Sequence, residues 1–315
     1  KHTMGDFQDA WQRIQLRIDI LISMLENGSI TETNACLEAN KLCTNLCMMQ
    51  TTQQHQQLTK SSPSTTDSDY QSLLYKKYKD TMELYTRSKV LPSLRGFTGN
   101  IIRTKESSTL FLEQVRHRWY NHHIMIKWLK NAFAYLDSHY VRTNGVPTLY
   151  QVGLDVFYDV VYTEFKCDIV VSCIEIINSD RKESHHQNDN ITVLNNDKIL
   201  LKSTIELFET MGMGSLNSYQ EDFEVPFLES TQEYYATRQI ELQQDAQYHN
   251  RVARILVQEE DRARRFSLRP STIEKLRDVC IGVLTRTRKG GGGDERGATK
   301  SVAESFFDAV CNAFQ

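Results

Sequence analysis

Apolar residues recur at steps of three and four along most of the chain, which is the spacing of one face of an α-helix. The clearest repeat opens the chain and runs through Phe7, Trp11, Ile14, Ile18, Leu21, Ile22 and Leu25. The same spacing predicts further helices over residues 33–49, 70–90, 110–120, 122–141, 152–165, 169–178, 200–210, 223–243, 248–266, 271–285 and 301–314. We find no convincing strand pattern, so the sequence predicts an all-α protein.

Polar, glycine-containing or proline-containing stretches separate these helices. We expect a surface loop over residues 51–68, a helix end before Pro92, a polar stretch over 95–108, a break at 144–147, a polar loop over 179–196 and a glycine-rich linker over 289–298.

The composition agrees with long helices. The 315 residues include 14 Gly and 5 Pro, whereas average usage would give about 22 and 16. A sandwich or barrel of this length needs many turns, which draw on both residues. With 40% hydrophobic and 24% charged residues, the chain can bury a sizeable core, which excludes wholesale disorder.

Charge and cysteine usage limit the partners and the location. Lys and Arg number 37 against 40 Asp and Glu, a net charge of −3, so we expect neither a nucleic-acid nor a membrane partner. No apolar stretch approaches the ~18 residues of a spanning helix, and the first residues lead straight into an amphipathic helix rather than a signal peptide. Seven Cys without a C-x-x-C pair fit a reducing compartment, so we expect a cytoplasmic or nuclear protein.

Few residues suggest metal binding or catalysis. Cys36, Cys43 and Cys47 lie within three helical turns, and small buried hydrophobes are favoured over a soft-metal site. His185-His186 fits a solvated loop pair better than a metal site. Gly212-x-Gly214 lies between helices, not after a strand as a phosphate-binding loop requires.

Two charged clusters also have structural explanations. Glu221, Asp222 and Glu224 precede a helix, where acids complement the macrodipole. An arginine cluster over residues 262–269 is flanked by acids at 259–261, and we expect a solvated helix face there. With no nucleophile on a recognisable elbow, we expect no catalytic residue, no metal site and no cofactor.

Several segments together resemble the N-terminal half of a cullin, the scaffold subunit of multisubunit ubiquitin ligases. The most specific is Tyr219-Gln-Glu-Asp-Phe-Glu-Val-Pro-Phe-Leu-Glu229, followed by Arg118-Trp-Tyr-Asn-His122, Ala134-Tyr-Leu-Asp-Ser-His-Tyr-Val141 and Val152-Gly-Leu-Asp-Val-Phe-Tyr-Asp159. The similarity covers about residues 6–288 in order. It is closest to the cullins that use an F-box adaptor, with the BTB-adaptor cullins next.

The resemblance implies a fold and a domain organisation. The fold would be an elongated stack of five-helix cullin repeats, a solenoid-like rod. Residues 1–165 would form the first, adaptor-binding repeat and residues 166–289 an incomplete second repeat. Residues 290–300 would be a linker, and 301–315 a terminal helix resembling the end of a third repeat. A shortened product, a spliced isoform and a gene-prediction error all fit this pattern.

The resemblance also implies an adaptor site on the second and fifth helices, residues 33–49 and 122–141. The implied adaptor-binding residues are Cys36, Leu37, Asn40, Lys41, Thr44, Lys130, Phe133, Asp137 and Tyr140. We expect the second helix to bury a core stripe of Ala39, Leu42 and Leu46. The residues expected to project away from this stripe are Cys36, Leu37, Asn40 and Thr44. The fifth helix carries two apolar stripes, so it is either deeply buried or also meets a partner, and we favour contact with a partner.

The sequence departs from the family on the second helix. Cullins commonly place aromatic anchors at the positions of Cys36, Asn40 and Thr44. Because Tyr and Trp dominate interface energetics, their replacement by small residues points to weaker binding or to a different adaptor.

By resemblance, the chain is a non-catalytic scaffold of an SCF-like ubiquitin ligase. It would bind a BTB-fold adaptor carrying an F-box substrate receptor, and a far half, if present elsewhere, would bind the RING subunit. One alternative is a helical tether of the vesicle-tethering type, which failure to bind any BTB-fold protein would favour. A second is an enzyme with a metal site at the histidines, which metal analysis would test.

Overall fold

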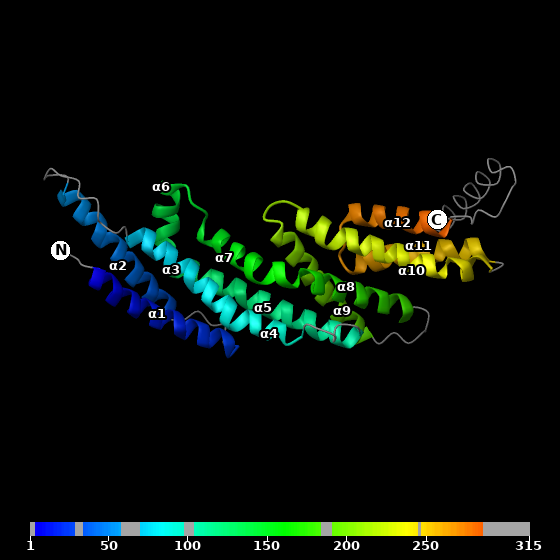
Figure 1. The fold of residues 1–315 in the computed structure, drawn as a ribbon, viewed down its shortest axis with the longest axis horizontal. Helices are drawn as coiled ribbons and strands as arrows, with labels where there is room; N and C mark the ends of the chain where they lie inside the picture. The colour runs from blue at the N-terminus through cyan, green and yellow to red at the C-terminus, as the bar shows by residue number, and fades with distance from the viewer. Residues whose placement is uncertain are drawn as a thin grey trace. The chain divides into compact units, whose positions relative to one another are not determined.

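The computed structural model describes residues 4–28, 34–57, 70–97, 104–183, 191–244 and 247–285. Over these residues the chain is helical apart from short turns and contains no strand (Figure 1). The predicted all-α class is therefore confirmed. Contacts divide the chain into two compact units, one formed by residues 1–99 and 113–165 and the other by residues 100–112 and 166–315.

The first unit is built from helices joined by short turns, several of which run into π-helical segments. Its elements are α1 (Met4–Glu26), α2 (Asn34–Gln57), α3 (Tyr70–Tyr85), η1 (Thr86–Val90), α4 (Leu91–Arg95), most of α5 (Lys105–Ala132), η2 (Leu136–Val141), α6 (Arg142–Asn144), α7 (Leu149–Phe157) and η3 (Tyr158–Tyr162). Helix α1 packs against α2 (Figure 1). Its buried face follows the predicted spacing: Phe7, Trp11, Ile14, Ile18, Leu21 and Leu25 are all buried.

Aromatic side chains join the helices of the first unit. The ring of Phe133, which is fully buried, lies 6.4 Å from Trp11 and 5.7 Å from Tyr78. The Tyr78 hydroxyl donates to the Leu149 carbonyl at 2.6 Å. Helix α7 approaches α5 so closely that a Cβ on Gly153 would lie 2.6 Å from Ile126 Cγ1. Only glycine fits this crossing without displacing a neighbour.

A buried histidine lies at the same crossing. His122 is fully buried, and its Nε2 is 2.8 Å from the Gly153 carbonyl. Its ring packs 4.9 Å from Phe157. Burial, with a smaller contribution from the nearby His123, outweighs the hydrogen bond to Gly153 and lowers the pKa of His122 from 6.5 to about 4. The ring is therefore neutral at pH 7, and its Nε2–H donates to the carbonyl.

We expect His122→Gln to weaken the acid sensitivity of folding. Above pH 6.5 the wild-type ring is neutral in both states, but below it the unfolded ring gains a proton that the folded ring gains only near pH 4. The wild type therefore loses on the order of 3 kcal/mol between these pH values because of His122. Glutamine retains an N–H donor and does not titrate. Denaturant unfolding across this pH window measures the difference, and parallel losses for both proteins would contradict the assignment.

The second unit contains a further set of packed helices. They are α8 (Thr163–Glu183), whose first turn belongs to the first unit, α9 (Ile191–Met211), η4 (Ser218–Glu224), α10 (Val225–Gln243), α11 (Tyr248–Arg265) and α12 (Pro270–Leu284). Helices α10, α11 and α12 lie side by side (Figure 1).

The segment with the most specific family resemblance has a structural role in the second unit. The Tyr219 hydroxyl lies 2.8 Å from Thr272 Oγ1. The Thr272 hydroxyl donates to Glu224 Oε1 at 2.6 Å. Lys275 Nζ pairs with the other Glu224 oxygen at 2.6 Å. The segment therefore fixes the start of α12 against η4.

Several predicted helix ends are wrong because polar residues do not always interrupt a helix. The helices predicted over 110–120 and 122–141 form one run, α5 and η2. Asn121, at the predicted junction, is buried and bonds His117. Pro92 lies in the first turn of α4, directly after the wide turn η1, where a missing N–H is tolerated. Helix α2 continues to Gln57, beyond the predicted end.

The described parts of the loop predicted over residues 179–196, namely residues 179–183 and 191–196, are also helical. Residues 152–183 form one run through α7, η3 and α8, and α9 already begins at Ile191. The side chains of Ser179, Asp180 and Arg181 are buried, so their polarity reflects internal pairing rather than exposure to water. His185-His186, the linker over 289–298 and the predicted helix over 301–314 lie outside the described residues.

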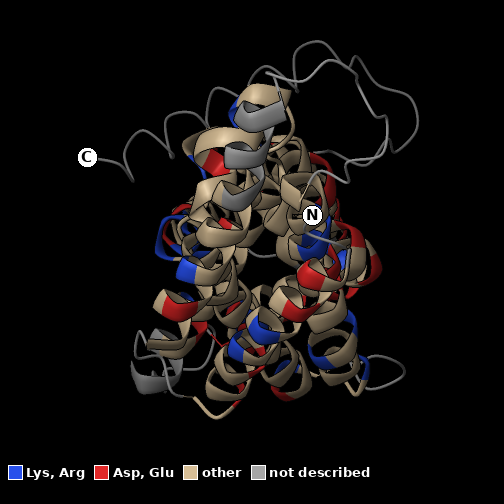
Figure 2. Ribbon diagram, turned by 90° about the vertical axis from the view of Figure 1, so that its left-hand side faces the viewer, with Lys and Arg blue, Asp and Glu red and all other residues tan. Residues whose placement is uncertain are grey.

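The described helices carry both basic and acidic side chains. Lys and Arg are interspersed with Asp and Glu along the helices in Figure 2. Among the described residues, no helix is long and apolar enough to cross a membrane.

Candidate functional site

Helix α2 presents its apolar face inward and a mixed ridge outward. The buried face consists of Ala35, Cys36, Ala39, Cys43, Leu46 and Cys47. The opposite side carries the i, i+4, i+7, i+11 series Leu37, Lys41, Thr44 and Met48, which we call the α2 ridge. Leu37 and Met48 are 63% and 54% exposed. The predicted orientation is therefore wrong for Cys36, which is buried, and for Leu42, which is only half-buried.

Two hydrogen bonds place α2 alongside the end of α5. The Cys36 thiol donates to the Trp128 carbonyl at 3.4 Å, and Asn40 Nδ2 donates to the Asn131 carbonyl at 2.7 Å. An advance of four residues along α2, from Cys36 to Asn40, matches an advance of three residues along α5, from Trp128 to Asn131. The two helices therefore run parallel here. Continuing this register brings Thr44 to the level of Tyr135.

The four implied residues on the fifth helix lie in different environments. Lys130 is exposed, whereas Phe133 is in the core. Asp137 Oδ1 accepts from the Leu149 N–H at 2.9 Å at the start of α7. The ring of Tyr140 lies 5.4 Å from Tyr75.

The nine implied adaptor-binding residues therefore divide by exposure. Leu37, Lys41 and Lys130 are exposed, Asn40, Thr44, Asp137 and Tyr140 are partly exposed, and Cys36 and Phe133 are buried. Cys36 and Asn40 of α2 bond carbonyls near the end of α5, while Asp137 and Tyr140 contact α7 and α3. A direct adaptor contact stays a prediction for each of them.

Met48, Tyr135 and His139 are not among the residues that the family resemblance implies for adaptor binding. Tyr135 and His139 stack with ring centroids 4.1 Å apart and an interplanar angle of 6°, and His139 is exposed. Ser138 Oγ lies 2.9 Å from His139 Nδ1. The one-turn spacing of Tyr135 and His139 on a helix was the available signal, since such pairs meet.

The two apolar stripes on the fifth helix are mostly covered by the chain itself. Ile126, Leu129, Phe133 and Leu136 of one stripe, and Met125, Trp128 and Ala132 of the other, are buried. Of the two explanations for a doubly apolar helix, burial within the chain therefore holds for these residues, and partner contact does not. Only Tyr135 and Tyr140, at the far ends of the stripes, remain partly exposed.

The three clustered cysteines on α2 are buried thiols that form no disulfide. Burial raises the pKa of the Cys43 thiol far above its usual range, and the neighbouring Cys47 and Cys36 add to the shift. The group therefore stays protonated and packs as a small hydrophobe. Among the described residues, no group of three or more His, Cys, Asp or Glu side chains has metal-binding geometry.

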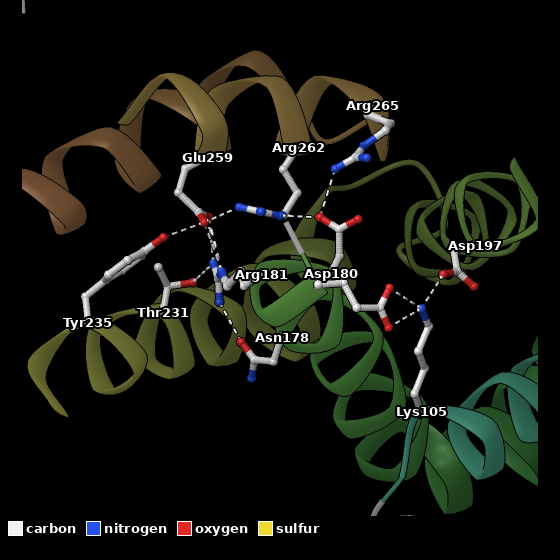
Figure 3. Close-up of polar contacts among 11 residues, drawn as sticks. Lys105, Asn178, Asp180, Arg181, Asp197, Thr231, Tyr235, Glu259, Arg262 and Arg265 are labelled. Carbon is white, nitrogen blue, oxygen red and sulfur yellow. Dashed lines mark hydrogen bonds and ion pairs between the residues drawn. The ribbon is translucent and has the colours of Figure 1, made fainter. Parts of the chain in front are cut away.

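The second unit contains a buried charge network that joins α8, α10 and α11 (Figure 3). Arg181 of α8 donates to Glu259 Oε2 at 2.8 Å, and the two side chains are 1% and 2% exposed. Tyr235 donates to Glu259 Oε1 at 2.6 Å, and Arg262 contacts the same oxygen. Arg262 Nε also donates to Asp180 at 2.6 Å.

Further partners satisfy the remaining donors around this network. Arg181 donates to Asn178 at 2.7 Å and to Thr231 at 2.8 Å, and Arg265 pairs with Asp180 at 2.8 Å. Lys105 Nζ lies 3.0 Å from Glu183 Oε1 and 3.2 Å from Asp197 Oδ2; Figure 3 labels Lys105 and Asp197.

This network overturns the predicted solvated face at Glu259, Glu260 and Arg262, whereas Asp261 and Arg264 are exposed as predicted. Glu259, Glu260 and Arg262 are 2–4% exposed. Burial alone would raise the pKa of Glu259, but the Arg181 and Arg262 guanidinium groups and their hydrogen bonds hold it below its ordinary value. Both signs of charge are thus retained inside the unit because each has a partner.

Glu224 is likewise buried and paired with Lys275, and Asp222 pairs with Lys166 at 2.8 Å. These acids therefore pair with distant basic side chains rather than only flanking a helix start.

Comparison with known proteins identifies the family. The model of the Cullin alpha solenoid domain matches residues 15–292. The chain is 32% identical over 293 residues to cullin-like protein 2 of Arabidopsis thaliana, covering 90% of this chain and 68% of that protein. It is 28% identical over 281 residues to cullin-like protein 3 of the same plant, covering 88% and 96%.

A longer relative matches over a smaller share. Cullin-1 of Oryza sativa subsp. japonica is 33% identical over 163 residues, covering 52% of this chain and 19% of that protein. The chain thus spans about a fifth of the rice protein's length, but nearly all of cullin-like protein 3. The matched range includes α2, α5 and the network helices, and on this basis the chain belongs to the cullin family.

Proposed function

We propose that this chain is a non-catalytic scaffold arm of a ubiquitin ligase, and that its first unit docks a BTB-fold adaptor carrying an F-box substrate receptor. The observation that carries the proposal is the α2 ridge with the parallel end of α5, an exposed surface on a cullin repeat. Membership of the cullin family favours this function over vesicle tethering.

The chemistry of the surface supports protein docking rather than catalysis. Leu37 and Met48 present apolar area at the two ends of the α2 ridge, and Lys41 between them is exposed. Exposed apolar side chains with a polar surround are typical of protein interfaces.

The surface also has a partial substitute for the aromatic anchors that α2 lacks. The Tyr135–His139 stack lies just after α5, where Tyr135 is at the level of Thr44 and His139 belongs to η2, and the rigid pair offers a flat aromatic area at little entropic cost. We infer that the anchor has moved from α2 to this segment, so that the adaptor contacts both.

In this function the contribution to catalysis is geometric. A cullin arm that holds a substrate receptor at a fixed position raises the effective concentration of the target lysine near the conjugating enzyme. A chain that binds the adaptor without a RING subunit would compete with complete scaffolds for adaptors.

The test is direct binding of the purified chain to the BTB-fold adaptor of F-box ligases, measured by calorimetry. We expect Leu37→Asp to weaken binding by about tenfold or more, since a buried interface anchor is worth about 1–2 kcal/mol or more. Combining it with Tyr140→Ala should abolish binding while circular dichroism stays helical.

Leu84→Asp is the matched control, because Leu84 on α3 is 65% exposed, against 63% for Leu37. Its affinity should equal that of the wild type. If Leu37→Asp binds normally, the α2 ridge is not the docking surface. If the wild-type chain binds neither this adaptor nor other BTB-fold proteins, the proposed function fails.

A further inference from the structure

The turn between α11 and α12 has an unusual residue at its apex. Helix α11 ends at Arg265, and α12 begins at Pro270. The Ser267 N–H bonds the Arg264 carbonyl at 3.1 Å, and the Leu268 N–H bonds the Ala263 carbonyl at 2.9 Å. These two bonds define a Schellman cap, whose apex usually holds glycine. Ser267 occupies this position with a φ of +62°.

The serine is the exposed residue of a turn that is otherwise anchored. Ser267 is exposed, whereas Phe266 and Leu268 on either side are 1% and 6% exposed. The two apolar side chains hold the turn to the unit, and the serine hydroxyl is left at its surface.

The residues before and after Ser267 form a recognisable chemical pattern. Arg264 and Arg265, the only adjacent arginine pair in the chain, lie three and two positions before it, and Leu268 follows it. Guanidinium groups at these positions suit an acidic substrate groove, because they bind carboxylates in a paired geometry. The apolar Leu268, directly after Ser267, suits a small hydrophobic pocket on the enzyme that binds this segment.

We propose that Ser267 is a phosphorylation site for an arginine-directed protein kinase. The Ser267 Oγ attacks the γ-phosphorus of Mg·ATP, the bond from that phosphorus to the ADP oxygen breaks, and the hydroxyl proton passes to the kinase's catalytic base. The products are phosphoserine, ADP and a proton. The adaptor proposal does not involve this turn.

The fold provides a receiving environment for the phosphate. Arg264, Arg265 and Arg269 have side chains that are 59%, 29% and 38% exposed. The start of α12 is three residues away, and its N-cap residue Arg269 offers no side-chain acceptor to the helix. A phosphate here gains charge-assisted hydrogen bonds and a favourable helix dipole.

Ion pairs connect the proposed phosphate site to the buried charge network of the unit. Arg265 pairs with Asp180 at 2.8 Å, and Asp180 in turn holds Arg262 in the buried network (Figure 3). Phosphoserine competes with Asp180 for Arg265, so modification at the surface changes the partners of a buried carboxylate.

The buried neighbours set the rate of modification. A kinase binds its substrate in an extended form, so Phe266 and Leu268 must leave their pockets before transfer. Phosphorylation therefore proceeds from a locally opened turn, more slowly than in a free peptide of residues 262–272, but to one phosphate per chain.

The test incubates the full chain with Mg·ATP and the catalytic subunit of cAMP-dependent protein kinase, an arginine-directed enzyme, and maps phosphate by mass spectrometry. Ser267→Gly should abolish incorporation and fits the left-handed backbone. Arg264→Gln, which removes an exposed arginine, should reduce incorporation severalfold. Ser271→Ala is the matched control and should be phosphorylated like the wild type, because Ser271 is exposed but has only Arg269 upstream at short spacing.

Two results would overturn the proposal. One is incorporation into the free peptide but none into the folded chain, which would show that the fold withholds the serine. The other is incorporation in the full chain that survives Ser267→Gly. As a second readout, the phosphorylated chain should melt at a higher temperature than the unmodified chain at low salt, with the gap narrowing as salt rises. A lower melting temperature would overturn the receiving role of the arginines.

Discussion

Replacing Arg181 by Met is expected to destabilise the second unit by about 3–5 kcal/mol, because it leaves a buried carboxylate without one of its two cationic partners. Glu259 would keep Arg262 and the Tyr235 hydroxyl but lose the bidentate Arg181 contact. Asn178 and Thr231 would also lose the guanidinium donors that they accept from. Methionine is similar in length, so the loss reflects charge and hydrogen bonding more than volume.

Denaturant unfolding measures the loss, and hydrogen exchange locates it in α8, α10 and α11. Lys182→Met is the matched control, since Lys182 is the next residue on α8, carries the same charge and is exposed. Its stability should stay within about 0.5 kcal/mol of the wild type. Equal losses for the two variants would contradict a specific role of the buried pair.

A double replacement separates pairing from packing. In Arg181→Met with Glu259→Gln, the uncompensated charge is gone, so the combined loss should be smaller than the sum of the two single losses. An additive result would show that Arg181 and Glu259 do not depend on each other.

Phe133→Ala is expected to cost about 3–5 kcal/mol of stability in the first unit, the usual range for removing a buried aromatic ring. Phe133 is fully buried between Trp11 and Tyr78, so its deletion opens a cavity among three helices. Any adaptor binding lost with it should follow the loss of folded protein, and low temperature or a stabilising background should restore it.

Tyr120→Ala provides the control for this prediction. Tyr120 lies on the same helix and is 54% exposed, so removing its ring should change stability by less than about 1 kcal/mol. If Phe133→Ala unfolds like the wild type and still loses adaptor binding, Phe133 is a contact residue and not a core residue.

The opening helix shows what periodicity can predict. Its heptad spacing names the buried face of α1 correctly, because a helix with one apolar stripe has only one orientation that buries it. Helix α2 is harder, because small Ala and Cys residues cover both sides of the stripe. Cys36 and Leu42 exchange the expected environments, since the parallel contact with α5 brings Trp128 and Asn131 to the Cys36 side.

The candidate docking surface was located only in outline. Resemblance placed it on α2 and α5, and the exposed Leu37, Lys41 and Lys130 agree with a surface position. Phe133 could not be separated from its neighbours, because an apolar residue on a doubly apolar helix has no sequence signal for which helix covers it. Met48 was missed because it continues the α2 ridge one turn beyond the family's familiar positions.

The charged residues show the limit most clearly. A mixture of Glu, Asp and Arg over residues 259–265 has the sequence pattern of an exposed helix face, and the stretch containing Arg181 that of a polar loop. The two stretches are buried against each other because Arg181 and Glu259, 78 residues apart in the sequence, neutralise one another.

By itself the sequence determined the all-helical class, the cullin family and the spacing of the apolar face in α1, because helix periodicity and family motifs are local. Only the tertiary structure decided which polar residues are internal and which apolar residues remain outside. It also showed that Ser267 stands alone at the surface of an anchored turn. The physical reason is that burial of a charge depends on a partner from a distant helix, and no local pattern encodes that partner.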